Sequence, residues 1–397
     1  MQRIAIVSAV RTPLGKLGGA LKNTAPEELT RIVIDEALKR AGLESSVVDE
    51  VIIGQTKQST DAPNIARLAL LKAGWDETIP AYTVHRQCAS GMQAILNGAQ
   101  EILTGFSDVV MVGGVESMST APFYLRKTRF GTGSGNQLLL DPNTESQPNS
   151  QPEEIYGRFT MIQTAENVAE KYGVTREDQD EFVLLSQERA VAAIDQGYFK
   201  EEIVPVAIPR RKQEDLIFDT DEFPRRDTSL EKLAKLKPII EGGSVTAGNA
   251  SGRNDGACAL LLMSEEKAKE LKCQPLAYVT GATAVGLDPR YMGMGPYFAT
   301  EKLLKKYDRK IEDFDLFEIN EAFASQSVAC ARELGIDIDK LNVNGGAIAL
   351  GHPLGCSGAR IITTMIYEMK RRGVKEGLAS ICVAGGLGMA MSIENAR

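Results

Sequence analysis

Cys88 is the residue of this sequence whose type and setting best fit covalent chemistry. It lies between an apolar, strand-like stretch that ends near Val84 and a helical pattern that begins at Ala89. A thiol at the start of a helix faces free backbone N–H groups and the positive end of the helix dipole, and both favour the thiolate. The sequence therefore predicts a nucleophile at Cys88. The alternative is an inert, buried thiol, because free cysteine is among the most buried residue types.

The chain has 2 histidines that could act as a base for this thiol. His85 lies three residues before Cys88 on the strand-like stretch, where a structural role is the favoured interpretation. His352 lies between glycines and a proline, on an irregular loop before another predicted helix. Loops of this kind bring backbone and side chains close to a ligand. We therefore expect His352 to be the base.

Four segments, in this order along the chain, together resemble the active-site loops of the thiolase family. The opening segment Ile4–Pro13 is also similar, so the resemblance spans the whole chain. It implies an acyltransferase that condenses acetyl-CoA with a second acyl-CoA to give a 3-ketoacyl-CoA and coenzyme A, or cleaves the product in the reverse direction. The four segments are Cys88–Gly91 (CASG), Asn320–Phe323 (NEAF), Gly351–Gly355 (GHPLG) and Cys382–Gly388 (CVAGGLG).

The resemblance implies a role for each residue of the expected active site. Cys88 carries the acyl group, and His352 takes its proton. Cys382 moves the proton at the α-carbon, and Asn320 acts as a hydrogen-bond donor through a bound water. The backbone N–H groups of Cys88 and Ala384 would form one oxyanion hole, and His352 and Asn320 would form the other.

The resemblance also implies a binding site for coenzyme A and the acyl chain, with no metal and no further cofactor. The residues expected there are Arg225 against the adenine, Ser251 on the pantetheine arm, Met161 and Met292 along the substrate channel, and Phe323. Biosynthetic thiolases commonly carry a histidine just before the position of Met161, and this chain has none there. The acyl-chain preference is left open, with longer or branched chains favoured.

Strand and helix patterns alternate in both halves of the chain, which predicts an α/β fold with mainly parallel sheets covered on both faces. The two patterns are similar and indicate an internal duplication of βαβ-type units. The resemblance implies that the halves lie back to back in five α/β/α/β/α layers. Expected strands are 4–10, 51–53 and 109–112 in the first half and 276–280, 316–319 and 379–383 in the last, with helices at 26–41 and 299–307 and after Cys88 and Gly355.

The chain is expected to divide into an N-terminal thiolase half at 1–119, an inserted loop domain at 120–250 and a C-terminal half at 251–397. The insertion begins with an exposed, mobile loop at 131–152 and continues with helical patterns at 164–172 and 176–196. The resemblance implies that it binds coenzyme A and carries subunit contacts. We expect a homodimer at least, with a homotetramer favoured.

Composition excludes several other classes of protein. A net charge of −8 argues against nucleic-acid binding, and no apolar run approaches the ~20 residues that span a membrane. The 6 cysteines form no Cys-x-x-Cys pair, so the usual zinc and dithiol patterns are missing. Scattered thiols suit a reducing compartment, which predicts a cytoplasmic protein.

Three other classes of protein would share some of these features. A β-ketoacyl synthase would share the fold and the nucleophile, but the Asn320–Phe323 segment and Cys382 argue against it. A Cys–His hydrolase would need a site that activates water, and no motif indicates one. A non-catalytic acyl-CoA-binding protein would have no need for Cys88, His352 and Cys382 together.

Overall fold

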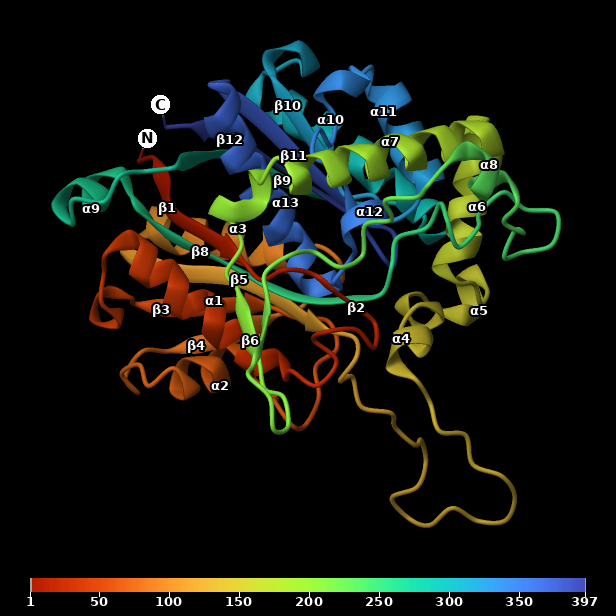
Figure 1. Cartoon of the computed structure of the whole chain (residues 1–397), viewed down its shortest axis with the longest axis horizontal. Coiled ribbons are helices and arrows are strands. Elements are labelled where there is room, and N and C mark those ends of the chain that lie inside the picture. Colours follow the sequence, from red (N-terminus) through yellow and green to blue (C-terminus); the bar gives the residue numbers. More distant parts are fainter. Residues whose placement is uncertain (1, 397) are drawn as a thin grey trace.

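The computed structural model describes residues 2–396 and contains one ten-stranded mixed sheet (Figure 1). The strands are β1 (Ile4–Arg11), β2 (Gly15–Lys16), β3 (Glu50–Gly54), β4 (Ala81–Val84), β5 (Val109–Ser117), β6 (Val206–Ile208), β7 (Leu216–Phe218), β8 (Asn254–Ser264), β9 (Ala277–Gly286), β10 (Leu316–Ile319), β11 (Glu376–Val383) and β12 (Leu387–Asn395). Their order in the large sheet is β10-β11-β12-β9-β1-β8-β5-β3-β4, with β2 paired to β8, while β6 and β7 form a separate pair.

Helices cover the outer faces of the sheet and fill the space between its two halves (Figure 1). The α-helices are α1 (Pro26–Ala41), α2 (Ile65–Lys72), α3 (Ser90–Thr104), α4 (Pro142–Glu145), α5 (Glu153–Tyr156), α6 (Met161–Tyr172), α7 (Arg176–Asp195), α8 (Leu230–Ala234), α9 (Glu265–Glu270), α10 (Gly295–Tyr307), α11 (Ala324–Leu334), α12 (Ala347–Leu350) and α13 (Leu354–Arg372). Helices α1 and α2 form one outer layer, α10 and α11 the other, and α3 and α13 the middle layer. The expected five-layered thiolase fold is confirmed.

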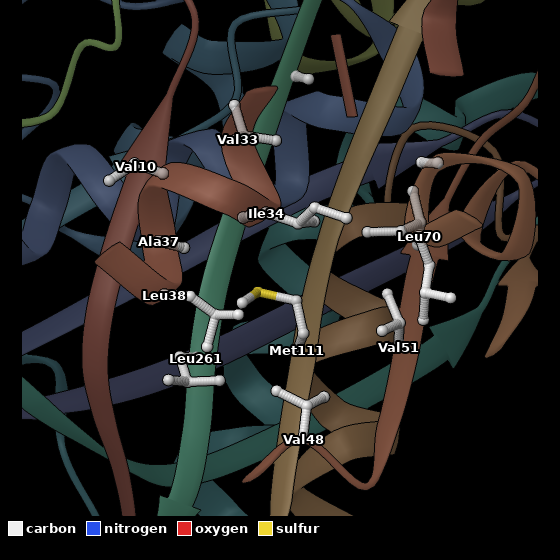
Figure 2. Close-up of a cluster of buried hydrophobic side chains, with 14 of the residues drawn as sticks. Val10, Val33, Ile34, Ala37, Leu38, Val48, Val51, Leu70, Met111 and Leu261 are labelled. Carbon is white, nitrogen blue, oxygen red and sulfur yellow. The ribbon is translucent and has the colours of Figure 1, made fainter. Parts of the chain in front are cut away.

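Helix α1 shows how the sequence pattern builds the outer layers. Its apolar residues recur at three- and four-residue spacing, so that Val33, Ile34, Ala37 and Leu38 share one buried face. Figure 2 shows these side chains on the sheet, above residues of β5 and β8. The helix ends at Gly42, whose φ of 69° is the left-handed conformation of a helix C-cap. The helix predicted over 26–41 is therefore confirmed.

The prediction of mainly parallel sheets is wrong. Only the ends of the sheet are parallel, where β3 pairs with β4 and β5, and where β10 pairs with β11. The central strands β8, β1, β9 and β12 pair antiparallel with their neighbours. Strand β12 follows β11 through a short turn, and a short turn can only reverse the chain. Strand patterns for β8 and β12 were not recognised in the sequence.

The two halves of the sheet meet where β1 pairs with β9, between Ile4–Ile6 and Ala277–Val279. Strand β8 lies on the first side of this junction, because it pairs with both β1 and β5. The predicted division at residue 251 stays a prediction. We propose that the first half extends through β8 to Ser264, because a strand belongs with the sheet that it completes.

The two middle helices approach each other closely at their first turns. A Cβ atom on Gly91 would lie 2.8 Å from the Gly355 carbonyl oxygen, and one on Gly358 would lie 2.6 Å from a backbone nitrogen of α3. Only glycine fits so close an approach of two backbones. This contact brings the chain before α3, which carries Cys88, beside the loop before α13, which carries His352.

The inserted segment contacts both halves, because Glu202 accepts a hydrogen bond from Arg11 of β1 and helices α6 and α7 pack against α11. Helix α7 begins at Arg176, as predicted, and Thr175 before it forms a capping box with Asp178. The loop expected at 131–152 is exposed only in its first part, and its mobility stays a prediction. Residues 129–139 are exposed on a loop that projects from the body of the molecule (Figure 1), whereas Asn143, Pro148 and Gln151 are buried.

Candidate active site

A cavity of about 390 Å³ opens where the inserted segment meets the carboxyl ends of the strands. Strands β3, β4 and β11 are each followed by a residue or loop that lines it. Ligands commonly bind at the carboxyl ends of strands in α/β proteins. The predicted site residues that line this cavity are Cys88, Met161, Arg225, Ser251, Met292, Phe323, His352, Cys382 and Ala384.

Cys88 lies on a tight turn between β4 and α3. The residue before it, Gln87, has a φ of 44°, which is unusual for a residue with a side chain. The Cys88 side chain is half-buried. Burial raises its pKa to about 11, although the backbone N–H groups of Ala384 and Cys88 and the charge of Lys57 favour the thiolate. The predicted lowering of this pKa is therefore wrong for the free protein, because burial outweighs the helix terminus.

His352 is buried, with one ring nitrogen held and the other free. Its Nδ1 lies 2.7 Å from the Ser357 hydroxyl oxygen, and this hydroxyl donates to the Pro353 carbonyl at 3.0 Å. The proton between His352 and Ser357 therefore belongs to Nδ1, and Nε2 keeps its lone pair. Nε2 has no hydrogen-bond partner among residues 2–396. Burial and the nearby charge of Arg360 lower the His352 pKa to about 3, so the ring is neutral.

His85 does not belong to this arrangement. Its side chain is exposed, and its Nδ1 accepts a hydrogen bond from the Gln87 backbone at 3.5 Å. It is not part of the cavity lining. The structure therefore places His352, and not His85, within the cavity that contains Cys88.

Cys382 and Ala384 enter the cavity from the end of β11. The Cys382 thiol is buried and lies 3.9 Å from the Gln326 side-chain oxygen. Burial raises its pKa well above the usual value, and the nearby Cys88 thiol raises it further. Ala384 keeps an ordinary φ, because Gly385 and Gly386 take the left-handed conformations of this turn. Its N–H group is thus free to point toward the Cys88 sulfur.

Asn320 follows β10 and is fully buried, but it does not line the cavity itself. In the described part of the chain, neither its side-chain oxygen nor its nitrogen has a hydrogen-bond partner. The next residue, Glu321, fixes this loop by accepting hydrogen bonds from Ser186 at 2.8 Å, Asn342 at 2.8 Å and the Ile348 backbone at 3.1 Å. A rigid loop therefore holds a polar side chain whose hydrogen-bonding capacity is unused.

The residues expected to bind coenzyme A lie around the mouth and the channel. Arg225 is exposed, with its guanidinium 5.7 Å from the centre of the Phe223 ring. Ser251 is held by its backbone N–H, which donates to the Ala322 carbonyl at 3.0 Å. Met292 and Phe323 are buried, and Met161 packs against the same cluster. A charged mouth and an apolar channel suit a long thioester with a phosphorylated end.

Several polar residues of the cavity were missed from the sequence. Lys57 follows β3, Gln87 precedes Cys88, and Asn143, Ser146, Gln147 and Ser150 come from the segment expected to be a mobile loop. The position of Lys57 was recognisable in principle. It comes four residues after the short apolar run at 51–53, and the ends of parallel strands meet at one edge of a sheet.

Comparison with known proteins identifies the family. A model described as "Thiolase, N-terminal domain" matches residues 4–266, and one described as "Thiolase, C-terminal domain" matches residues 273–395. An acetyl-CoA acetyltransferase of Chromobacterium violaceum is 49% identical over 392 residues, which cover 98% of this chain and 99% of that protein.

Two solved structures are similar over nearly their whole length. The acetyl-CoA acetyltransferase of Bacillus anthracis has a TM-score of 0.96 and 50% identity, with 100% of this chain and 99% of that chain covered. Human mitochondrial 3-ketoacyl-CoA thiolase in complex with CoA has a TM-score of 0.93 and 42% identity, with 99% and 98% covered.

The fold and these matches define an acyltransferase. The chain belongs to the thiolase family. Thiolases use coenzyme A as a substrate or product and need no further cofactor. Within residues 2–396 no group of three or more His, Cys, Asp or Glu side chains is arranged to hold a metal ion, and no helix is long and apolar enough to cross a membrane.

Proposed function

We propose that this thiolase-family acyltransferase catalyses the reversible condensation of acetyl-CoA with a second acyl-CoA to give a 3-ketoacyl-CoA and coenzyme A, through an acyl group carried on Cys88. One observation carries this proposal. Two thiols, Cys88 and Cys382, and the free Nε2 of His352 belong to one cavity. A nucleophile, a base and a second proton carrier are the groups that this chemistry needs.

In the cleavage direction, Cys88 attacks the 3-keto carbonyl while His352 Nε2 takes its proton. The bond between C2 and C3 breaks, and the acyl group stays on the Cys88 sulfur. The acetyl-CoA carbanion takes a proton from Cys382, whose raised pKa lets it hold that proton until the bond breaks. Protonated His352 and Asn320 donate to the enolate oxygen, with Asn320 acting through a water. Both groups have hydrogen-bonding capacity that the described chain does not use.

Transfer to coenzyme A then restores the enzyme. The Cys382 thiolate first recovers its proton from protonated His352 through water. Neutral His352 then takes the proton of the incoming thiol, whose sulfur attacks the acyl-Cys88 carbonyl. Cys88 leaves and recovers its proton from His352. The backbone N–H groups of Cys88 and Ala384 would stabilise the oxyanion, and loss of one such donor commonly costs about 2.7–4 kcal/mol. Their effect on the Cys88 pKa supports this role.

The binding residues follow from their places in the cavity. Arg225 would contact the adenine end of coenzyme A, and Ser251 the pantetheine arm. Met161, Met292 and Phe323 would line the channel for the arm and the acyl chain. The exposed guanidinium of Arg225 forms no ion pair with the rest of residues 2–396, which supports its availability to a phosphorylated ligand.

We further propose a homo-oligomer, a homodimer at least and a homotetramer by preference. Two features support this. Strand β4 is the end strand of the sheet, so one of its edges is open to pairing. The projecting loop exposes Phe130 by 99%, Leu138 by 76% and Leu139 by 64%. Exposed apolar groups of this kind mark interaction sites. Light scattering that showed a 43.0 kDa monomer at micromolar concentration would contradict the proposal.

A cytoplasmic location and a role in the metabolism of fatty acyl thioesters are part of the same proposal. The six cysteines are all free thiols, including two in the cavity, and free thiols need a reducing compartment. Fractionation of cells that produce the chain would test this location, and recovery outside the cytoplasm would contradict it.

Mass spectrometry after incubation with acetyl-CoA tests the proposed reaction. We expect one acetyl adduct, on Cys88, and none in Cys88→Ala. Cys356→Ala is the matched control, because Cys356 is a buried thiol outside the cavity lining and should leave the adduct unchanged. An acetyl group on another residue, or none at all, would refute acyl-Cys88.

A further inference from the structure

Lys57 is a buried cation at the reactive end of the cavity. Its residue is 8% exposed, and it lines the cavity that contains Cys88. Burial lowers the Lys57 pKa, while Glu116, the Cys88 thiol and Asp141 oppose this shift. Lysine is rarely buried without a partner, because the removal of a charge from water is costly.

The ammonium of Lys57 is poorly satisfied by the chain itself. It donates one hydrogen bond, to the Ser146 hydroxyl at 2.5 Å. An ammonium has three N–H donors, and in the described residues that of Lys57 forms neither an ion pair nor a second hydrogen bond. Glu116 is close enough to favour the charge, but its carboxylate accepts hydrogen bonds from the backbone of Thr56, Lys57 and Gly355. Two donors of Lys57 are therefore available to a ligand.

The rest of the cavity wall increases the attraction for an anion. Arg253 also lines the cavity, and its charge lowers the Lys57 pKa. No Asp or Glu is among the lining residues. The lining thus contains cations and no carboxylate, and Glu116 and Asp141, which favour the Lys57 charge, lie outside it.

The anion expected beside Lys57 is not a phosphate of coenzyme A. Lys57 and Cys88 each influence the pKa of the other, so Lys57 lies near the sulfur that receives the acyl group. The phosphates lie at the far end of the pantetheine arm from the thioester. The mouth has its own cation, the exposed Arg225.

We propose that Lys57 selects an acyl group whose far end is a carboxylate, so that the preferred substrates are coenzyme A thioesters of dicarboxylic acid chains. This inference rests on the proposed thiolase reaction. The carboxylate takes no part in the bond changes, which are those described above. It accepts hydrogen bonds from Lys57, while the methylene groups of the chain lie along the apolar part of the cavity. The longer or branched apolar chains suggested by the sequence are then the poorer substrates.

Lys57 also favours the Cys88 thiolate, and this effect must be separated from selection. Stabilisation of the Cys88 thiolate speeds the transfer of every acyl group by the same factor. Selection changes the ratio between two acyl groups. The ratio of kcat/KM values for a matched pair of substrates is therefore the informative quantity.

The test uses the purified full chain and two six-carbon 3-ketoacyl-CoA substrates, one that ends in a carboxylate and one that ends in a methyl group. We expect the wild type to cleave the carboxylate substrate with a kcat/KM about 10-fold or more above that of the methyl substrate, the range for a hydrogen bond to a charged group. Lys57→Met should abolish this preference. Lys57→Arg, which keeps the charge, should retain most of it, and Lys39→Met, on the surface, should not change it.

Equal or better cleavage of the methyl substrate by the wild type would overturn the inference. A Lys57→Met variant whose kcat/KM fell by the same factor for both substrates would also overturn the inference. Exchange of labelled coenzyme A with acetyl-CoA is measured in parallel. Exchange without a carboxylate preference refutes only the role of Lys57, whereas loss of exchange in the wild type refutes the proposed function as well.

Discussion

Two buried polar clusters in this molecule differ in how completely their hydrogen bonds are formed. Around Arg11, which is fully buried, every charge has a partner. The guanidinium donates to Glu202 at 2.6 Å and to both oxygens of Asp221 at 2.8 and 2.9 Å. These bonds tie β1 to the inserted segment. Although burial alone would lower the Arg11 pKa, its two carboxylate partners raise it above the usual value, so the charge is held permanently.

Around His352, by contrast, several polar atoms have no hydrogen bond. The free Nε2 of His352 and both side-chain atoms of Asn320 are buried without a partner within residues 2–396. A buried polar group that lacks its hydrogen bond costs about 1–3 kcal/mol. We expect the substrate to supply the missing partners of these two residues. Of the two clusters, the one with completed hydrogen bonds ties segments of the fold together, and the one with incomplete hydrogen bonds contains the proposed base.

The largest effect is expected from breaking the complete cluster. Arg11→Met leaves the buried carboxylates of Glu202 and Asp221 without their cation, which typically costs about 3–5 kcal/mol. Urea denaturation should show this loss, while the activity of each folded molecule is retained. Arg226→Met is the control, because Arg226 pairs with Asp195 at the surface, and its removal should leave stability almost unchanged. Equal stability of the two variants would remove the proposed distinction.

A change in the incomplete cluster should act on the reaction and not on the fold. His352→Asn removes the proton acceptor, and turnover should fall by about 100-fold or more. The unfolding midpoint in urea should fall much less than in Arg11→Met, because the substitution breaks no ion pair. His85→Asn is the matched control at an exposed position. A larger loss of turnover in His85→Asn would reverse the assignment of the two histidines.

The smallest effect concerns the resting charge of the pair. With a Cys88 pKa of about 11 and a His352 pKa of about 3, both groups are neutral near pH 7. The rate of Cys88 alkylation by iodoacetamide should then rise about tenfold per pH unit between pH 7 and 9, because only the thiolate reacts. A rate that is already constant over this range would show a preformed thiolate and imidazolium.

The sequence predicts the chemical groups of the site better than their energetics. Cys88, His352 and Cys382 are recognisable because each lies in a short glycine-containing segment, and the structure brings them into one cavity. The Cys88 pKa could not be predicted, because desolvation depends on neighbours that are distant in sequence. The burial of Lys57 could not be predicted for the same reason, although its place after a strand was recognisable. Its partner Ser146 is 89 residues away in the chain.

In the fold, too, local features were predictable and long-range contacts were not. Helix α1 was predicted with its bounds, because its start at Pro26 and its stop at Gly42 are local features. The place of β8 was not predictable. This strand is wholly buried, so it shows no alternation of polar and apolar residues, and its pairing with β1 and β5 depends on long-range contacts.

The division of labour between the two thiols is the central claim, and one variant tests it directly. Cys382→Ala should still be acetylated on Cys88 and should still exchange labelled coenzyme A with acetyl-CoA, because this half-reaction needs only Cys88, His352 and the oxyanion donors. It should lose the exchange of the acetyl-CoA methyl protons for deuterium, and with it the formation of the carbon–carbon bond. Intact condensation in Cys382→Ala, or an acetyl group on Cys382 of the wild type, would contradict the account.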